Sequence, residues 1–127
     1  MSIEVPELAY WKTLHKIEGG WNMTKEVMVP LTIPESWGMY TPAGNKAITT
    51  RAQKLVDKIL KAETYGKKLD AISSFLKSYA KMSDTRNRRE ALDTDVRDGV
   101  LGFCENLCMC LGIQLNILNT IWEEDYE

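Results

Sequence analysis

The chain has 127 residues, of which 44% are hydrophobic and 27% are charged, and its formal net charge at pH 7 is −2. This length predicts one domain with a core that needs no disulfide or metal, and the small net charge gives no general attraction to nucleic acid or anionic membranes. No apolar run approaches the roughly 18 residues of a membrane span, and the first residues lack the features of a signal peptide. We therefore expect a cytoplasmic protein that does not associate with membranes.

Residues 1–41 are expected to form a short helix and then an extended arm. Pro6 suits the first turn of a helix, and Gly19-Gly20 would end it. The apolar residues at helical spacing between them are Leu8, Trp11, Leu14 and Ile17. From residue 27 to residue 33 apolar residues alternate with others, which is typical of a strand. Because Pro30 and Pro34 cannot donate backbone hydrogen bonds, this strand is expected at a sheet edge or in an arm.

Two aromatic residues, Trp37 and Tyr40, close this arm. Large aromatic side chains mostly supply buried area, so packing on the core or on a partner subunit is the favoured interpretation. Stacking on a base or nucleotide is the alternative, because every base offers a flat face to an aromatic ring.

The rest of the chain, residues 42–127, is expected to be a helical core. Thr41 suits an N-cap and Pro42 the first position of a helix that runs to about Glu63. A further helix is expected over residues 67–81. The positions expected to be buried in these two helices are Ile48, Ala52, Leu55, Val56, Ile59, Leu60, Leu69, Ile72, Phe75, Leu76 and Tyr79.

A long central helix is expected from about Arg88 to residue 111, and Gly112 would end it. Its apolar face comprises Leu92, Val96, Val100, Phe103, Cys104, Leu107, Cys110 and Leu111. Gly99 and Gly102 lower helix propensity by about 1 kcal/mol each, which favours a close approach by a neighbouring backbone. A last helix would bury Leu115, Ile117, Leu118, Ile121 and Trp122. The predicted fold is mainly α: a single domain of four or five helices packed as a bundle, with an extended N-terminal arm or short edge strand.

The three cysteines, Cys104, Cys108 and Cys110, lie within one short segment and have no distant partner. An odd count in one segment argues against a disulfide framework and favours reducing surroundings. A zinc site would need a fourth ligand, and His15 is the only histidine. We expect small buried thiols and no metal requirement for folding.

One sign of charge follows a single face of the helix that begins at Pro42. Arg51, Lys54, Lys58 and Lys61 are spaced three, four and three residues apart, and form a continuous basic stripe. An amphipathic helix needs a polar outer face in any case, so a solvated surface is one interpretation. A face of one charge sign can also hold phosphates or an acidic partner. A second basic run, Arg86, Arg88 and Arg89, precedes the central helix.

A carboxylate pair, an apolar helix and a glycine turn occur in a suggestive order: Asp95-x-x-Asp98, then Leu111-Gly112-Ile113. Together with residues 62–72, this order resembles the all-α nucleoside triphosphate pyrophosphohydrolases of the MazG type. The resemblance implies carboxylates that converge on Mg²⁺ around a polyphosphate. The residues it would assign to this role are Glu63, Glu90, Asp93, Asp95 and Asp98. Ala62 and Gly66 stand where that family has further carboxylates, which favours a helical fold of this kind without the catalysis.

From these patterns we expect a non-enzymatic binding protein without a cofactor. It would act as a homo-oligomer and engage a protein partner or a phosphate-bearing ligand such as a nucleotide. The expected contact residues are Arg51, Lys54, Lys58, Lys61, Arg86, Arg88 and Arg89, with Trp37 and Tyr40 as possible stacking groups. A Mg²⁺-dependent pyrophosphohydrolase and a small RNA- or DNA-binding subunit are the two alternatives.

Overall fold

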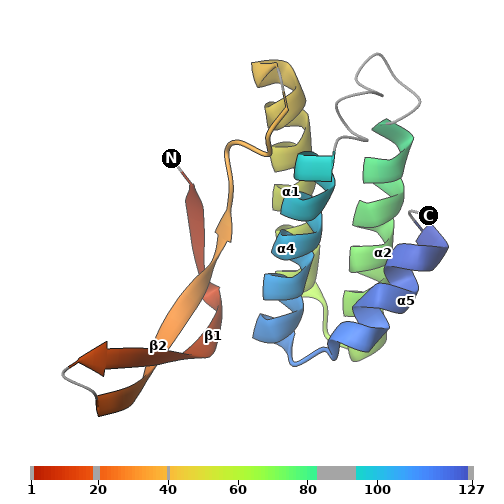
Figure 1. The fold of residues 1–127 in the computed structure, drawn as a ribbon. Coiled ribbons are helices and arrows are strands. Elements are labelled where there is room, and N and C mark those ends of the chain that lie inside the picture. The colour runs from red at the N-terminus through yellow and green to blue at the C-terminus, as the bar shows by residue number, and fades with distance from the viewer. Residues whose placement is uncertain (1, 19–20, 40, 83–93, 126–127) are drawn as a thin grey trace.

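The computed structural model describes residues 2–18, 21–39, 41–82 and 94–125, and within them it is mainly helical, as expected. The elements in chain order are β1 (Ile3–Glu18), β2 (Trp21–Ile33), α1 (Pro42–Lys61), α2 (Tyr65–Met82), α4 (Thr94–Leu111) and α5 (Leu115–Asp125). β1 and β2 pair as an antiparallel hairpin. Figure 1 shows α1, α2 and α4 side by side, α5 leaning across the lower part of α2, and the hairpin on the side of α4.

The helix expected around Leu8–Ile17 is wrong, because this segment is strand β1. Val5 pairs with Leu31 and Ala9 with Pro30, so residues 6–8 have no counterpart on β2 and form a large bulge. The bulge turns both Val5 and Leu8 toward the core, where each is 7% exposed. This three-residue interval between buried positions resembles a helical period. The strand expected over residues 27–33 is confirmed as part of β2.

The start of α1 follows the predicted capping pattern. Thr41 has an extended backbone, and its hydroxyl accepts a 3.1 Å hydrogen bond from the backbone N–H of Gly44, while Pro42 occupies the first turn. The helix ends at Lys61, two residues before the predicted end. The next helix, α2, starts at Tyr65 rather than at residue 67.

Gly112 ends α4 as predicted. Its φ of +71° lies in the left-handed region that favours glycine. The N–H of the next residue, Ile113, donates a 2.9 Å hydrogen bond to the carbonyl of Cys108, which is the bond of a Schellman motif. The chain therefore reverses within three residues and enters α5. The predicted start of this central helix, at about Arg88, lies outside the described residues.

One hydrophobic core joins the base of the hairpin to the helices. Phe103 of α4 belongs to this core and joins two aromatic side chains, with ring centroids 5.6 Å from Trp37 and 6.0 Å from Phe75 in edge-to-face arrangements. The largest fully buried side chains are Tyr79, Leu31, Ile33, Ile48, Leu55, Ile72, Leu76, Leu107, Leu118, Val96, Val100 and Cys104. Most of the predicted core positions are confirmed.

Two predicted core positions are wrong, because Leu60 is 47% exposed and Leu115 is 46% exposed. Both lie at helix ends: Leu60 is in the last turn of α1, and Leu115 is the first residue of α5. The close approach expected at Gly102 is also absent, since a Cβ built there would meet nothing within 4 Å. A Cβ built at Gly99 would lie 3.9 Å from the carbonyl oxygen of Trp37, which is an ordinary van der Waals contact.

Candidate functional site

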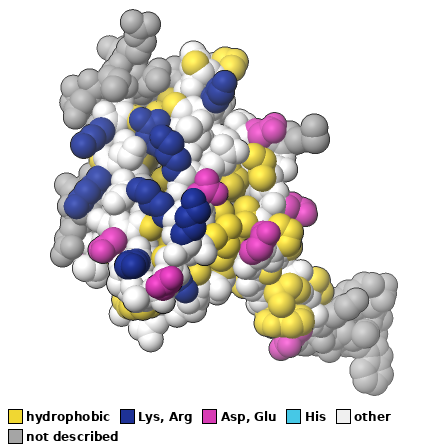
Figure 2. Space-filling model, turned by 180° about the vertical axis from the view of Figure 1, so that it is seen from behind, with side chains coloured by type: hydrophobic (Ala, Val, Ile, Leu, Met, Phe, Trp, Pro, Cys, Tyr) yellow, Lys and Arg dark blue, Asp and Glu magenta, His cyan; other side chains and the backbone are white. Residues whose placement is uncertain are grey.

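The predicted basic stripe of α1 lines a groove between α1 and α2. Two hollows, of about 80 and 370 Å³, share Lys58, Ala71 and Ser74 and so adjoin one another. The polar side chains along this basic groove are Arg51, Lys54, Lys58 and Lys61 from α1 and Lys67, Asp70, Ser74 and Ser78 from α2. Figure 2, which views the molecule from behind, shows Lys and Arg side chains gathered over the half of this face away from the hairpin.

Arg51 is held in place at one end of the basic groove. Its Nε donates a 2.8 Å hydrogen bond to the Ser78 hydroxyl oxygen, and its Nη1 donates a 3.0 Å bond to the carbonyl of Ala47. Both bonds are made by a half-buried side chain that loses rotamer freedom in folding rather than in binding. The guanidinium still has unused N–H donors, so Arg51 is a fixed cation that can bind an anion.

The three lysines of the stripe are different, because Lys54, Lys58 and Lys61 are exposed. Within the described part of the chain, none of them makes an ion pair. Asp70 is the one carboxylate that lines the described groove. The positive charge of the stripe is therefore largely available to a ligand.

The spacing of these cations suits a row of anionic groups. Arg51 and Lys61 are ten residues apart on α1, which corresponds to about 15 Å along the helix axis. Neighbouring cations are thus about 5 Å apart, within the Debye length of about 8 Å at physiological salt, so their potentials add. Ser74 and Ser78, one helical turn apart on α2, provide hydroxyls that can donate to phosphate oxygens. The arrangement can bind two or more phosphate groups.

The sequence-based contact set is only partly brought together. Arg51, Lys54, Lys58 and Lys61 share the groove, but Arg86, Arg88, Arg89 and Tyr40 lie outside the described residues. Trp37 does not fit the role of a stacking group, because it is 3% exposed and its indole N–H donates a 3.0 Å bond to Thr49. Its ring faces belong to the core.

Lys67, Ser74 and Ser78 were missed by the sequence reasoning, although they form the second wall of the groove. A signal was present, because the two serines are four residues apart on the polar side of α2. That signal gains meaning only once α2 is known to pack against the basic side of α1.

Among the described carboxylates of the MazG-type motif, Glu63 lies far from Asp95 and Asp98. Glu63 follows the end of α1, whereas Asp95 and Asp98 are in the first turns of α4. In Figure 1 these two helix ends lie at opposite ends of the helical body, and α1 alone is about 30 Å long. Among the described residues no group of three or more His, Cys, Asp or Glu side chains could hold a metal ion. Glu90 and Asp93 lie outside the described residues.

The side chain of Asn45 holds the segment before α1 in place through hydrogen bonds to its backbone. Its Oδ1 accepts hydrogen bonds from the backbone N–H groups of Trp37 (2.7 Å) and Met39 (3.3 Å). Its Nδ2 donates to the carbonyls of Met39 (3.3 Å) and Thr41 (3.4 Å). Asn45 also lines a hollow of about 610 Å³ beside the start of α1, but its polar atoms are already engaged.

The thiols are free, and two of the three are fully inside the protein: Cys104 and Cys108 are buried, and Cys110 is half-buried. Cys108 thus takes the core place that was predicted for Cys110. Burial, with smaller contributions from the neighbouring Cys108 side chain and Glu105, raises the pKa of Cys104 far above its ordinary range. Burial and then Glu105 raise the pKa of Cys108 to about 11. Both thiols stay protonated and poorly reactive at neutral pH.

Comparison with known proteins identifies no relative: no family model, no curated protein sequence and no solved structure matches this chain. Within the described residues, none of the helices is long and apolar enough to cross a membrane.

Proposed function

We propose that the protein is a non-enzymatic binding protein that holds a phosphate-bearing ligand in the basic groove. The observation that carries this proposal is a row of exposed lysines, Lys54, Lys58 and Lys61, which make no ion pair with the described residues and lie beside the pre-positioned Arg51. Charge-assisted bonds from such cations to phosphate are shorter and stronger than neutral hydrogen bonds. A ligand with several phosphates would gain from all of them at once.

We propose that the four described helices pack as a bundle and that the protein acts in the cytoplasm, where reducing conditions suit its free thiols. Several cationic side chains line the groove, but only one of the described side chains that line it is a carboxylate. Binding without turnover is therefore favoured over the pyrophosphohydrolase alternative, in which several carboxylates must surround Mg²⁺.

A charge-reversal experiment tests the groove directly. The Lys54→Glu/Lys58→Glu variant would be compared with wild type for binding of ATP and of a fluorescently labelled single-stranded oligonucleotide. Both lysines are exposed, so the fold should be retained. We expect binding of either probe to weaken at least about tenfold, and oligonucleotide binding to fall more steeply with salt than ATP binding.

A matched control separates the site from overall charge. Lys46→Glu/Lys81→Glu changes the net charge equally, at exposed lysines of α1 and α2 that do not line the groove. It should bind nearly as wild type does. Equal losses in the two double variants, or no binding by wild type, would show that the stripe is only a solvated face. Release of pyrophosphate from ATP with Mg²⁺, abolished in Glu63→Gln/Asp98→Asn, would instead support the enzyme alternative.

A further inference from the structure

The far half of the hairpin carries an exposed apolar pair. Beyond the bulge, residues 9–18 of β1 pair with residues 21–30 of β2, and Figure 1 shows this part, here called the arm, extending away from the helices. Trp11 lies directly opposite Met28, so both side chains stand on the same face of the ribbon. They are 64% and 48% exposed. Since an isolated two-stranded ribbon is marginally stable in water, this face indicates a surface that another molecule covers.

A second set of exposed apolar side chains lies at one end of the helical body. Leu60, Tyr65, Met109 and Leu115 are each 46–50% exposed. They belong to the last turns of α1 and α4 and the first turns of α2 and α5. Figure 1 shows these four helix ends together at the same end of the molecule, here called the apolar end. Among the described residues, these four and the arm pair make up six of the seven large exposed hydrophobic side chains.

We propose that two copies of this chain form a dimer by reciprocal arm exchange, in which the Trp11–Met28 face of each arm packs on the apolar end of the other copy. The Trp11–Met28 pair is not covered by the described helices of its own copy, as the exposure of both side chains shows. If a two-fold axis relates the copies, the arm of each copy covers the apolar end of the other. Neither surface is then left free for a third copy, so the assembly closes as a dimer. The proposal is independent of ligand binding in the basic groove.

The available area selects this arrangement over a simple contact between arms. Ten paired positions, rising about 3.4 Å each in two strands about 5 Å apart, give one arm face roughly 340 Å². A stable interface buries about 600–1,000 Å² from each partner, so two arm faces pressed together are too small. Reciprocal exchange uses an arm face and an equal area of the apolar end from each copy. That doubles the area to about 680 Å² per partner, within the usual range.

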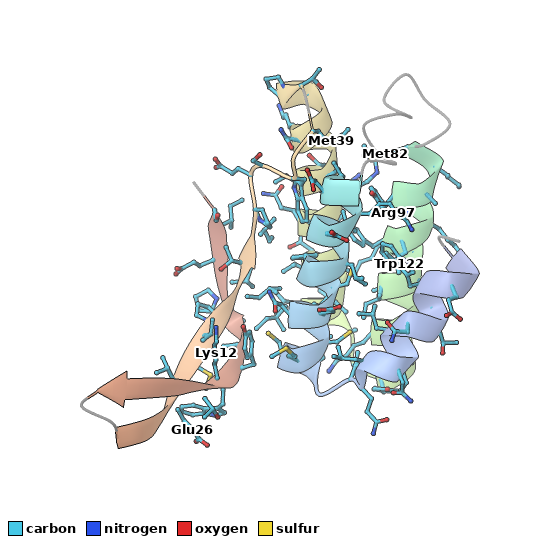
Figure 3. The ribbon with its side chains drawn as sticks, in the orientation of Figure 1. Lys12, Glu26, Met39, Met82, Arg97 and Trp122 are labelled. Atoms are coloured by element: carbon cyan, nitrogen blue, oxygen red, sulfur yellow. The ribbon has the colours of Figure 1, made fainter. Side chains whose placement is uncertain are left out.

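The first test is the oligomeric state of the whole chain by sedimentation velocity at micromolar concentration. Wild type should be a dimer, and Trp11→Asp should be a monomer with an unchanged helical circular dichroism spectrum, because the side chain is exposed in the single copy. Trp11→Ser provides a second variant if the aspartate perturbs the hairpin. Lys12→Asp is the matched control, because it stands on the opposite face of the arm and is labelled in Figure 3. It should remain a dimer.

Mixing two defective variants tests which surfaces meet. Met109→Lys/Leu115→Lys alters the apolar end and should also be monomeric alone. A mixture with Trp11→Asp should form a heterodimer, because one arm contact is then fully native and the other pairs opposite charges. Its recovery supports arm exchange and would not follow from contact between two arms. A monomeric wild type, a dimeric Trp11→Asp and Trp11→Ser, or a mixture that stays monomeric would each overturn the proposal.

Discussion

Replacing Asn45 with Ala should destabilise the protein substantially, although the side chain is small and only half-buried. The change removes an acceptor from the backbone N–H groups of Trp37 and Met39 and a donor to two carbonyls. A hydrogen bond contributes about 1 kcal/mol net, and the three longer bonds contribute less than the 2.7 Å bond from Trp37. We expect a loss of about 2–3 kcal/mol in the free energy of unfolding, or about 10 °C in Tm at this chain length.

The assay is urea unfolding followed by circular dichroism, with Asn106→Ala as the control. Asn106 is exposed on α4 and makes no side-chain hydrogen bond to the described residues, so its replacement should change stability by less than about 0.5 kcal/mol. Asn45→Asp keeps the acceptor for Trp37 but loses both donations, and should fall between Asn45→Ala and wild type. A loss for Asn45→Ala no larger than that for Asn106→Ala would refute the structural role assigned to this side chain.

Three further predictions concern glycine and thiol positions. Gly112→Ala should cost about 1 kcal/mol, measured by urea unfolding, because its φ is +71°. Gly102→Ala should instead stabilise by up to about 1 kcal/mol, because it lies within α4 and its added Cβ meets nothing; equal effects at the two sites would contradict this reasoning. The pKa of Cys108 is raised from 9.0 to about 11, so the folded protein favours the protonated thiol. The contribution of this thiol to the free energy of unfolding is therefore complete below pH 9 and is lost toward pH 11, by at most about 1.4 kcal/mol per pH unit. Cys108→Val should reduce this alkaline loss in unfolding measured across pH, and an unchanged slope would show that another group is responsible.

The helices were predictable because their ends carry local chemistry. Thr41 and Pro42 define the start of α1, and Gly112 defines the end of α4, through bonds and φ values that depend only on nearby residues. Apolar periodicity then identified most of each buried face. It failed at Leu60 and Leu115, which lie at helix ends, because periodicity assigns a face but does not show how far along the helix that face is covered.

The hairpin was misread because of the bulge in β1. Extra residues between Val5 and Ala9 allow Val5 and Leu8 to be buried three positions apart, which hides the two-residue period of a strand. A cue was available in Gly19-Gly20, since two glycines between apolar segments are a hairpin signal as well as a helix stop. Recognising the second strand as a partner, rather than as an isolated arm, would have favoured the hairpin.

The candidate site was half predictable for a related reason. The cations of α1 follow from its sequence alone, because spacing fixes which residues share a helical face. The opposite wall depends on how α2 packs, and the bond from Arg51 to Ser78 joins residues 27 positions apart. No local pattern predicts such a pair.

The most direct test of the central claim is an NMR titration of the ¹⁵N-labelled full chain with ATP and with a short single-stranded oligonucleotide. We predict that the backbone amide shifts concentrate in residues 51–61 of α1 and 67–78 of α2, and that raising the salt concentration reverses them. Shifts confined to α4, α5 or the segment around Asn45, or no shifts with either probe, would contradict the assignment of the basic groove as a phosphate-binding site.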